Sequence, residues 1–162
     1  MARATYQIED EPSPGALARI VVQPLWPFLA LMLAGAWLAW PWFALNSFAM
    51  GSPTRRKELG LTLLGLVAPV VVLLAFASIF DFQAAQDRTR TRLLMLPVIV
   101  VKLAVGYVLY LLQARTFAIY RYYGGVARSG LAVLLIGAFL LHDQVDRLVG
   151  NPLLKLVLGL VP

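Results

Sequence analysis

Lys102 lies within an apolar stretch, Leu93 to Leu112, that is long enough to cross a bilayer. A charged side chain at that depth costs roughly 2.5 kcal/mol or more, so such residues usually turn inward toward a partner or a wet cavity. On a helix, Lys102, Tyr110 and Gln113 fall on one broad face together with Gly106. The sequence therefore predicts a polar site inside a membrane bundle, centred on Lys102.

His142 and Asp143 are the residues best suited to join this site, because they follow the last long apolar segment. A cluster of lysine, carboxylate and histidine inside a bundle has the components of a proton relay or an ion-coupled gate. The alternative is structural: Lys102 forms one buried pair, or bonds a carbonyl freed near Pro97, and fixes the packing of its helix. A third interpretation is that Lys102 faces a neighbouring subunit.

The spacing of His142, Asp143 and Asp146 also raises the question of a metal site, since His142 and Asp146 are four residues apart. The chain has one histidine and no cysteine, which is a poor set of zinc ligands. We expect helix-end hydrogen bonds and surface ion pairs here instead. The sequence also lacks a Gly-x-Ser-x-Gly elbow, a phosphate loop and a GxGxxG fingerprint. We therefore predict no catalytic residue, no metal and no cofactor.

The composition indicates a membrane environment. Of 162 residues, 60% are hydrophobic and 14% are charged, whereas soluble domains carry about 25% charged residues. The net charge of +6 is spread over short loops, a pattern typical of topology control and interfacial anchoring, and we expect no nucleic-acid partner. The absence of cysteine excludes disulfides and thiolate catalysis.

Four hydrophobic segments would position these residues. After a polar leader, residues 1–24, we expect membrane spans at about 25–48, 60–80, 93–113 and 126–145, and then an amphipathic segment, 148–162, that re-enters or lies on the membrane. The fourth span is the weakest, because its uninterrupted apolar core is only about 18 Å long as a helix. The predicted fold class is an all-α integral membrane protein, with residues 25–162 as one polytopic domain.

Local signals refine these segments. Gly124 and Gly125 predict a helix stop after an aromatic extension of the third span. Gly65 gives the second span a small position where another helix can approach closely. Pro41 is expected to kink or end the first helix.

Aromatic and basic residues mark the expected membrane boundaries. The first segment has tryptophans near both ends, which resembles two aromatic belts. A stretch between residues 115 and 128 interleaves arginines with aromatic rings, which favours interfacial anchoring, or binding to anionic headgroups or to an acidic partner surface. The predicted lipid-contacting residues are Trp26, Trp40, Trp42, Arg115, Arg121 and Arg128.

The positive-inside rule gives little guidance on orientation. In a four-span topology, seven basic residues share the side of the two termini and six lie on the other side. We place both termini in the cytoplasm because nothing near the N-terminus resembles an exported domain. Compact loops and an Ala-, Leu- and Arg-rich composition suggest a bacterial inner membrane.

The function that best fits these features is that of a small non-catalytic membrane subunit or assembly factor. Its expected partners are membrane lipids and either other membrane subunits or further copies of the chain. One alternative is an oligomeric transporter or channel component that uses Lys102. A second alternative is a lipid-modifying enzyme that uses His142 or Asp143 at the membrane boundary.

Overall fold

The computed structural model describes residues 12, 15–79 and 88–160, so residues 1–11 and 13–14 of the predicted leader and residues 161–162 of the predicted C-terminal segment lie outside the described part. Within these residues all the regular elements are helical, which confirms the all-helical part of the predicted fold class. The elements are η1 (Ala16–Ile20), α1 (Leu25–Leu33), α2 (Ala36–Met50), α3 (Arg55–Ile79), α4 (Arg88–Tyr122), α5 (Leu131–Leu135), η3 (Ile136–Leu141), α6 (His142–Leu148) and α7 (Pro152–Leu158).

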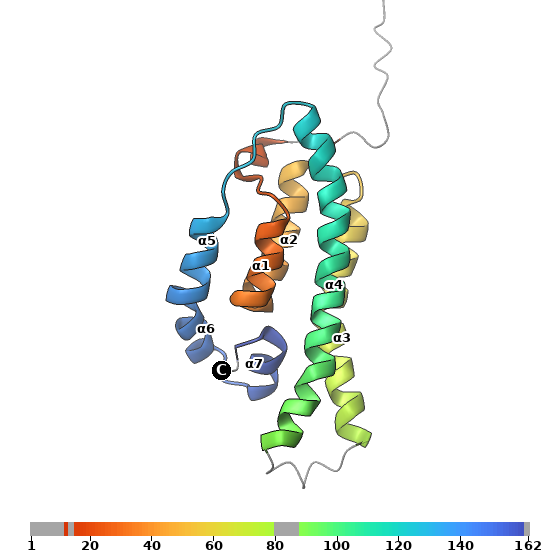
Figure 1. The fold of residues 1–162 in the computed structure, drawn as a ribbon, viewed down its shortest axis with the longest axis vertical. Helices are drawn as coiled ribbons and strands as arrows, with labels where there is room; N and C mark the ends of the chain where they lie inside the picture. Colours follow the sequence, from red (N-terminus) through yellow and green to blue (C-terminus); the bar gives the residue numbers. More distant parts are fainter. Residues whose placement is uncertain (1–11, 13–14, 80–87, 161–162) are drawn as a thin grey trace, which may run out of the picture.

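The helices α3 and α4 form a long antiparallel hairpin along one side of the molecule (Figure 1). Each contains a segment long and apolar enough to cross a membrane, Arg55–Phe76 in α3 and Met95–Tyr122 in α4. The two predicted spans in this region therefore correspond to single helices. As predicted, α4 continues through the aromatic extension and stops before Gly124.

The prediction of one continuous span over residues 25–48 is wrong. The helix breaks at Ala34 and Gly35, and α2 runs back alongside α1 (Figure 1). Gly35 has φ +100°, a conformation that glycine adopts far more readily than other residues. Pro41 neither ends nor divides this segment but lies within α2. Both ends of the α1–α2 hairpin therefore lie at the same end of the bundle.

The fourth segment differs from its predicted bounds of 126–145. Its helix begins at Leu131 and continues through η3, a π-helical turn, to Leu148. Beyond it, α7 packs against α2 and α3 and reaches the tip of the α1–α2 hairpin. The C-terminal segment is thus part of the bundle core: Val157 and Leu160 are buried.

The hydrophobic core surrounds α2. The Trp40 ring covers Gly65 of α3, where an added Cβ would lie 2.6 Å from the ring, so the predicted close approach at Gly65 is confirmed. Trp40 and Trp42 were expected to contact lipid, and this is wrong: both are buried in the core. Trp26 is half-buried against the same core, near Gly130. Because the segment folds back, its tryptophans pack on neighbouring helices.

Candidate functional site

A buried carboxyl group lies in the first turns of α3. Glu58 is 1% exposed, and its two oxygens accept three side-chain hydrogen bonds. Ser52 Oγ and Thr54 Oγ1 donate to Oε1, the latter at 2.7 Å, and Gln113 Nε2 of α4 donates to Oε2 at 3.0 Å. The loop before α3 and the facing helix thus hold the carboxyl between them, which meets the requirement that a buried polar group be paired.

Gln113 extends these bonds across the bundle. Its Nε2 also donates to Phe43 O at 2.8 Å, and its Oε1 accepts from Asn46 Nδ2 at 3.1 Å. Asn46 Oδ1 in turn accepts the backbone N–H of Val22 at 3.0 Å. The chain of bonds joins α2, α3, α4 and the segment before α1. We call this set the polar network: Asn46, Ser52, Thr54, Glu58 and Gln113.

Lys102 lies in a second buried place, further along α4. It is 9% exposed, and its Nζ donates to Val157 O at 3.2 Å, in the last turn of α7. The last carbonyls of a helix have no partner within the helix, and the end of its dipole favours a cation. Gly159, with φ +75°, ends α7 beside the Lys102 amine and against Gly35. We call this meeting of α4, α7 and the α1–α2 tip the Lys102 junction.

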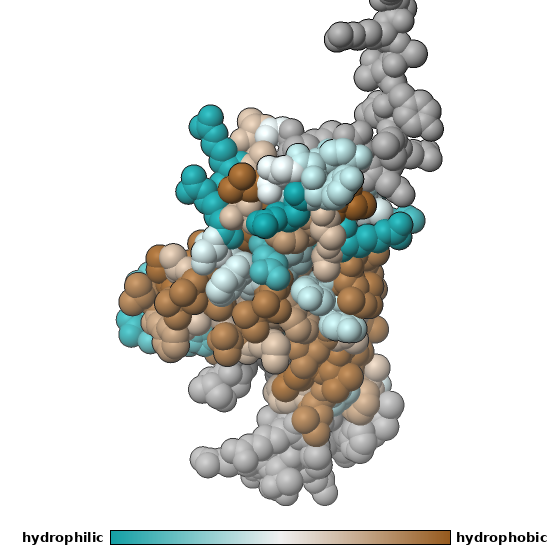
Figure 2. Space-filling model, turned by 45° about the horizontal axis from the view of Figure 1, so that its top comes forward, coloured by the Kyte–Doolittle hydropathy of each residue, from teal (hydrophilic) through white to brown (hydrophobic). Residues whose placement is uncertain are grey.

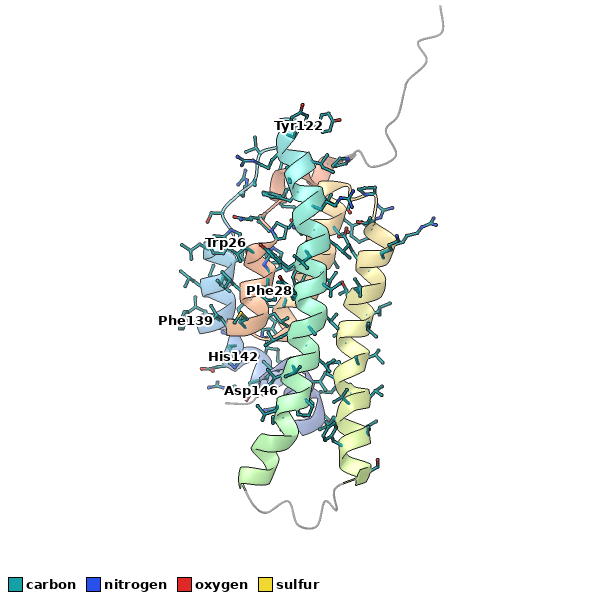
Figure 3. The ribbon with its side chains drawn as sticks, turned by 45° about the vertical axis from the view of Figure 1, so that its right-hand side comes forward. Trp26, Phe28, Tyr122, Phe139, His142 and Asp146 are labelled. Atoms are coloured by element: carbon teal, nitrogen blue, oxygen red, sulfur yellow. The ribbon has the colours of Figure 1, made fainter. Side chains whose placement is uncertain are left out.

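His142 reaches the same hairpin tip from α6. Its Nδ1 lies 3.4 Å from Ala34 O, and Figure 3 shows it along one segment with Phe139 and Asp146. Asp146 forms an ion pair with Lys155 at 2.8 Å. Asp143 is exposed and has no hydrogen bond or ion pair within the described residues. The structure therefore brings Lys102 and His142 to the turn between α1 and α2 but leaves Asp143 away from that turn.

The polar face predicted for α4 is directed inward, but its members serve different places. Lys102 belongs to the junction and Gln113 to the polar network. Between them, Tyr110 is half-buried in an aromatic cluster with Phe28, at 5.6 Å between ring centroids, and Tyr107, at 6.1 Å. The single polar site expected from the spacing is thus divided into three.

Glu58 and Asn46 were not among the predicted site residues. A signal was present, because Asn46 interrupts an apolar run just as Gln113 does. Glu58, however, follows three basic residues in the short loop expected between the first two spans. Its burial depends on Gln113, 55 positions away.

Basic residues concentrate at the end of the bundle where α4 ends. Hydrophilic residues gather there in Figure 2, and hydrophobic ones cover the flanks. Because α1 and α2 fold back, Arg19 lines the same pocket as Arg128 at this end, whereas the expected four-span topology placed the leader, residues 1–24, on the opposite side from Arg128. The basic residues at this end are Arg19, Arg55, Arg56, Lys57, Arg115, Arg121 and Arg128, of which the three predicted lipid contacts, Arg115, Arg121 and Arg128, are exposed.

Over residues 12, 15–79 and 88–160, the structure shows no group of three or more His, Asp or Glu side chains that could hold a metal ion. No protein-family model, curated protein or solved structure matches this chain. Its function must therefore be inferred from its own geometry.

Proposed function

We propose that the protein is an integral membrane protein that acts as a non-catalytic subunit or assembly factor of a membrane complex. The observation that carries this proposal is the exposure of its long apolar helices. Only 22% of the most apolar part of Arg55–Phe76, and 17% of that of Met95–Tyr122, is buried. A core helix of a soluble protein would be mostly buried, so lipid or partner helices are needed to cover these faces.

A second apolar face supports a role in assembly. Val133, Phe139 and Leu140 of the α5–η3 segment are exposed, and in Figure 1 this segment and α3 flank the α1–α2 hairpin on opposite sides. The polar network inside the bundle is paired internally, as a packing role requires. Both outer faces are thus available to lipid or to another subunit.

The same proposal states which membrane holds the protein and which end of the bundle faces the cytoplasm. Seven basic residues gather at the end where α4 ends, and five lie toward the other end, at Arg88, Arg90, Arg92, Arg147 and Lys155. By the positive-inside rule, the end with seven faces the cytoplasm. This orientation replaces the expectation of two cytoplasmic termini, because η1 lies at the end with seven and α7 lies toward the other end (Figure 1). Compact loops and composition favour a bacterial inner membrane.

Tryptophan substitution on each face should locate the partner. Leu64 of α3 and Leu140 of η3 are both exposed apolar residues, and tryptophan remains compatible with lipid while being too large for a close helix–helix contact. We expect the tagged wild type, purified in native nanodiscs, to retain a stoichiometric partner of different sequence. Either Leu64→Trp or Leu140→Trp should lower its recovery about tenfold, which corresponds to about 1.4 kcal/mol, and the other should not.

The mass of the purified nanodisc particle shows which chains it contains, and this composition tests the proposal. A wild-type nanodisc that holds one copy of the chain and lipid, or only further copies of the chain, contradicts the role of subunit. Equal partner recovery from both tryptophan variants contradicts the use of these two faces for assembly.

A second candidate function is that of an oligomeric transporter or channel component with Lys102 as its substrate or proton site. One observation favours it: the end of α1, the start of α2 and the end of α7 all meet near Lys102. Interrupted helices that meet within a membrane often form the ion or substrate sites of transporters. A single chain of this size has little room for a pathway, so this function requires several copies.

Lys102→Met should distinguish the two functions. Methionine keeps the apolar stem but loses the hydrogen bond to Val157 O, so we expect the free energy of unfolding to fall by about 1–2 kcal/mol and partner recovery to fall with it. The exposed Lys57→Met is the matched control. If Lys102→Met instead preserves stability and assembly but abolishes proton or solute flux in liposomes, the transport function is supported and the first proposal is contradicted.

A further inference from the structure

A pocket of about 440 Å³ lies between η1 and the loop that follows α4. We call it the basic pocket, because two arginines, Arg19 and Arg128, are among its lining residues, together with Tyr120, Tyr123, Gly124 and Gly125. Its volume lies within the range of small-ligand sites. No Asp or Glu occurs among its described lining residues.

The floor of the pocket is built by the end of α4. Gly124, with φ +82°, donates its N–H to Arg121 O, and Gly125 donates its N–H to Tyr120 O at 2.9 Å, which is a Schellman motif. The Tyr120 ring packs directly on Gly125, where a Cβ would overlap it, and Tyr120 Oη donates to Val126 O at 3.3 Å. The loop is thus held closely over a buried ring.

The two arginines are on segments that are bonded to each other. The backbone N–H of Arg128 donates to Val21 O at 2.8 Å, two residues after Arg19. The neighbouring Val22 donates its N–H to Asn46 of the polar network. These bonds use backbone atoms of the loop segments, so the side chains of Arg19 and Arg128 remain available to a ligand.

Charge then determines which ligand fits. Two arginines that line one pocket place two positive charges around it, which favours an anionic ligand, and guanidinium binds phosphate oxygens in a bidentate manner. The pocket lies at the basic end of the bundle, and the exposed Tyr122 lies at the same end (Figure 3). Aromatic rings and arginines together are typical of the headgroup level of a membrane.

We propose that the basic pocket binds the phosphate of an anionic phospholipid headgroup, held between Arg19 and Arg128. The exposed apolar surface of Tyr123 and Val126 beside it contacts the glycerol and the first acyl carbons. This inference rests on the proposed membrane embedding of α3 and α4.

The test uses the full chain in nanodiscs of phosphatidylcholine with and without phosphatidylglycerol. The probe variant is Arg19→Gln/Arg128→Gln, and the control, Arg56→Gln/Lys57→Gln, removes the same charge from exposed positions at the same end but outside the pocket. Native mass spectrometry counts the lipids that remain bound. We expect wild type and control to prefer phosphatidylglycerol about tenfold and the probe variant to lose the preference, because the proposal has Arg19 and Arg128 bond the phosphate directly, whereas Arg56 and Lys57 lie outside the pocket.

Each of the other possible outcomes contradicts one specific part of the proposal. If the chain enters neither kind of nanodisc, the proposed membrane function fails. If it enters both and the probe variant keeps the wild-type preference, or the control loses as much as the probe, the pocket proposal fails while membrane embedding stands. If glycerol phosphate added in lipid-free detergent stabilises wild type as strongly as phosphatidylglycerol does, the ligand is a soluble phosphate ester rather than a lipid. The melting temperature of the probe variant in phosphatidylcholine alone should equal that of wild type, because the bond from Arg128 to Val21 O uses the backbone N–H, which glutamine retains.

Discussion

Replacing Glu58 with alanine should lower the free energy of unfolding by about 3 kcal/mol. The substitution removes the acceptor of three hydrogen bonds in a fully buried place. Ser52 and Thr54 lie 3.1 Å apart and can still bond each other, so one hydroxyl hydrogen and one amide hydrogen of Gln113 lose their acceptor. A buried donor without a partner costs about 1–3 kcal/mol, and two such donors together account for the expected loss.

Glu58→Gln separates the loss of hydrogen bonds from the loss of packing. Glutamine keeps the shape and one acceptor oxygen, and hydroxyl groups can rotate to accept from its amide, so less than half of the alanine effect is expected. Arg56→Ala, at an exposed position on the same turn, is the control and should change stability little. Unfolding by SDS in mixed micelles, followed by circular dichroism, measures all three. An alanine variant as stable as the Arg56 control would show that Glu58 does not support the bundle.

The features that the sequence predicted correctly depend on local chemistry. The all-helical fold, the extended α4 and its stop at Gly124 follow from apolar runs and from a glycine that can adopt the left-handed conformation. The close approach at Gly65 follows from the absence of a side chain there. Each of these signals lies within a few residues of the feature that it predicts.

The α1–α2 hairpin could not be predicted in the same way. Residues 25–48 are continuously apolar, and such a run can be covered by lipid as one span or by other helices as a hairpin. The break at Gly35 is stabilised by contact with Leu158 and Gly159, more than a hundred residues later in the chain. The buried state of Glu58 has a similar origin, because three adjacent basic residues suggest a surface while a distant amide provides the partner.

The division of the predicted polar site has the same physical cause. Spacing on one helix correctly showed that Lys102 and Gln113 point inward, but it contains no information about what meets them there. Lys102 meets the end of α7, and the single histidine meets the α1–α2 tip. Such partners depend on how the short helices fold back, and that fold was the part that hydropathy could not determine.

Replacing Gly35 with alanine should destabilise the bundle by about 3 kcal/mol or more and release α7. Two independent effects act at this position. The residue has φ +100° and ψ 175°, where a side chain introduces about 1–3 kcal/mol of backbone strain. In addition, its new Cβ would lie 2.6 Å from Leu158 O, a backbone atom that cannot move without displacing α7. Gly60→Ala is the matched control, because Gly60 lies in helix α3 with nothing within 4 Å of the added Cβ, and a small gain in stability is expected there.

A unique thiol can show whether α7 is released. The chain contains no cysteine, so Val157→Cys introduces one reactive group at a buried position while leaving the carbonyl that binds Lys102 in place. In the otherwise wild-type chain this thiol should resist a water-soluble maleimide. In the Gly35→Ala chain it should react with the maleimide at a rate near that of a thiol introduced by Gln144→Cys, because Gln144 is exposed on α6. Protection that persists beside a lowered melting temperature would mean that the hairpin tip yields while α7 stays in place. Such a result would assign the docking of α7 to Lys102 and the buried side chains of α7, because the backbone contact at Gly35 would then be dispensable for it.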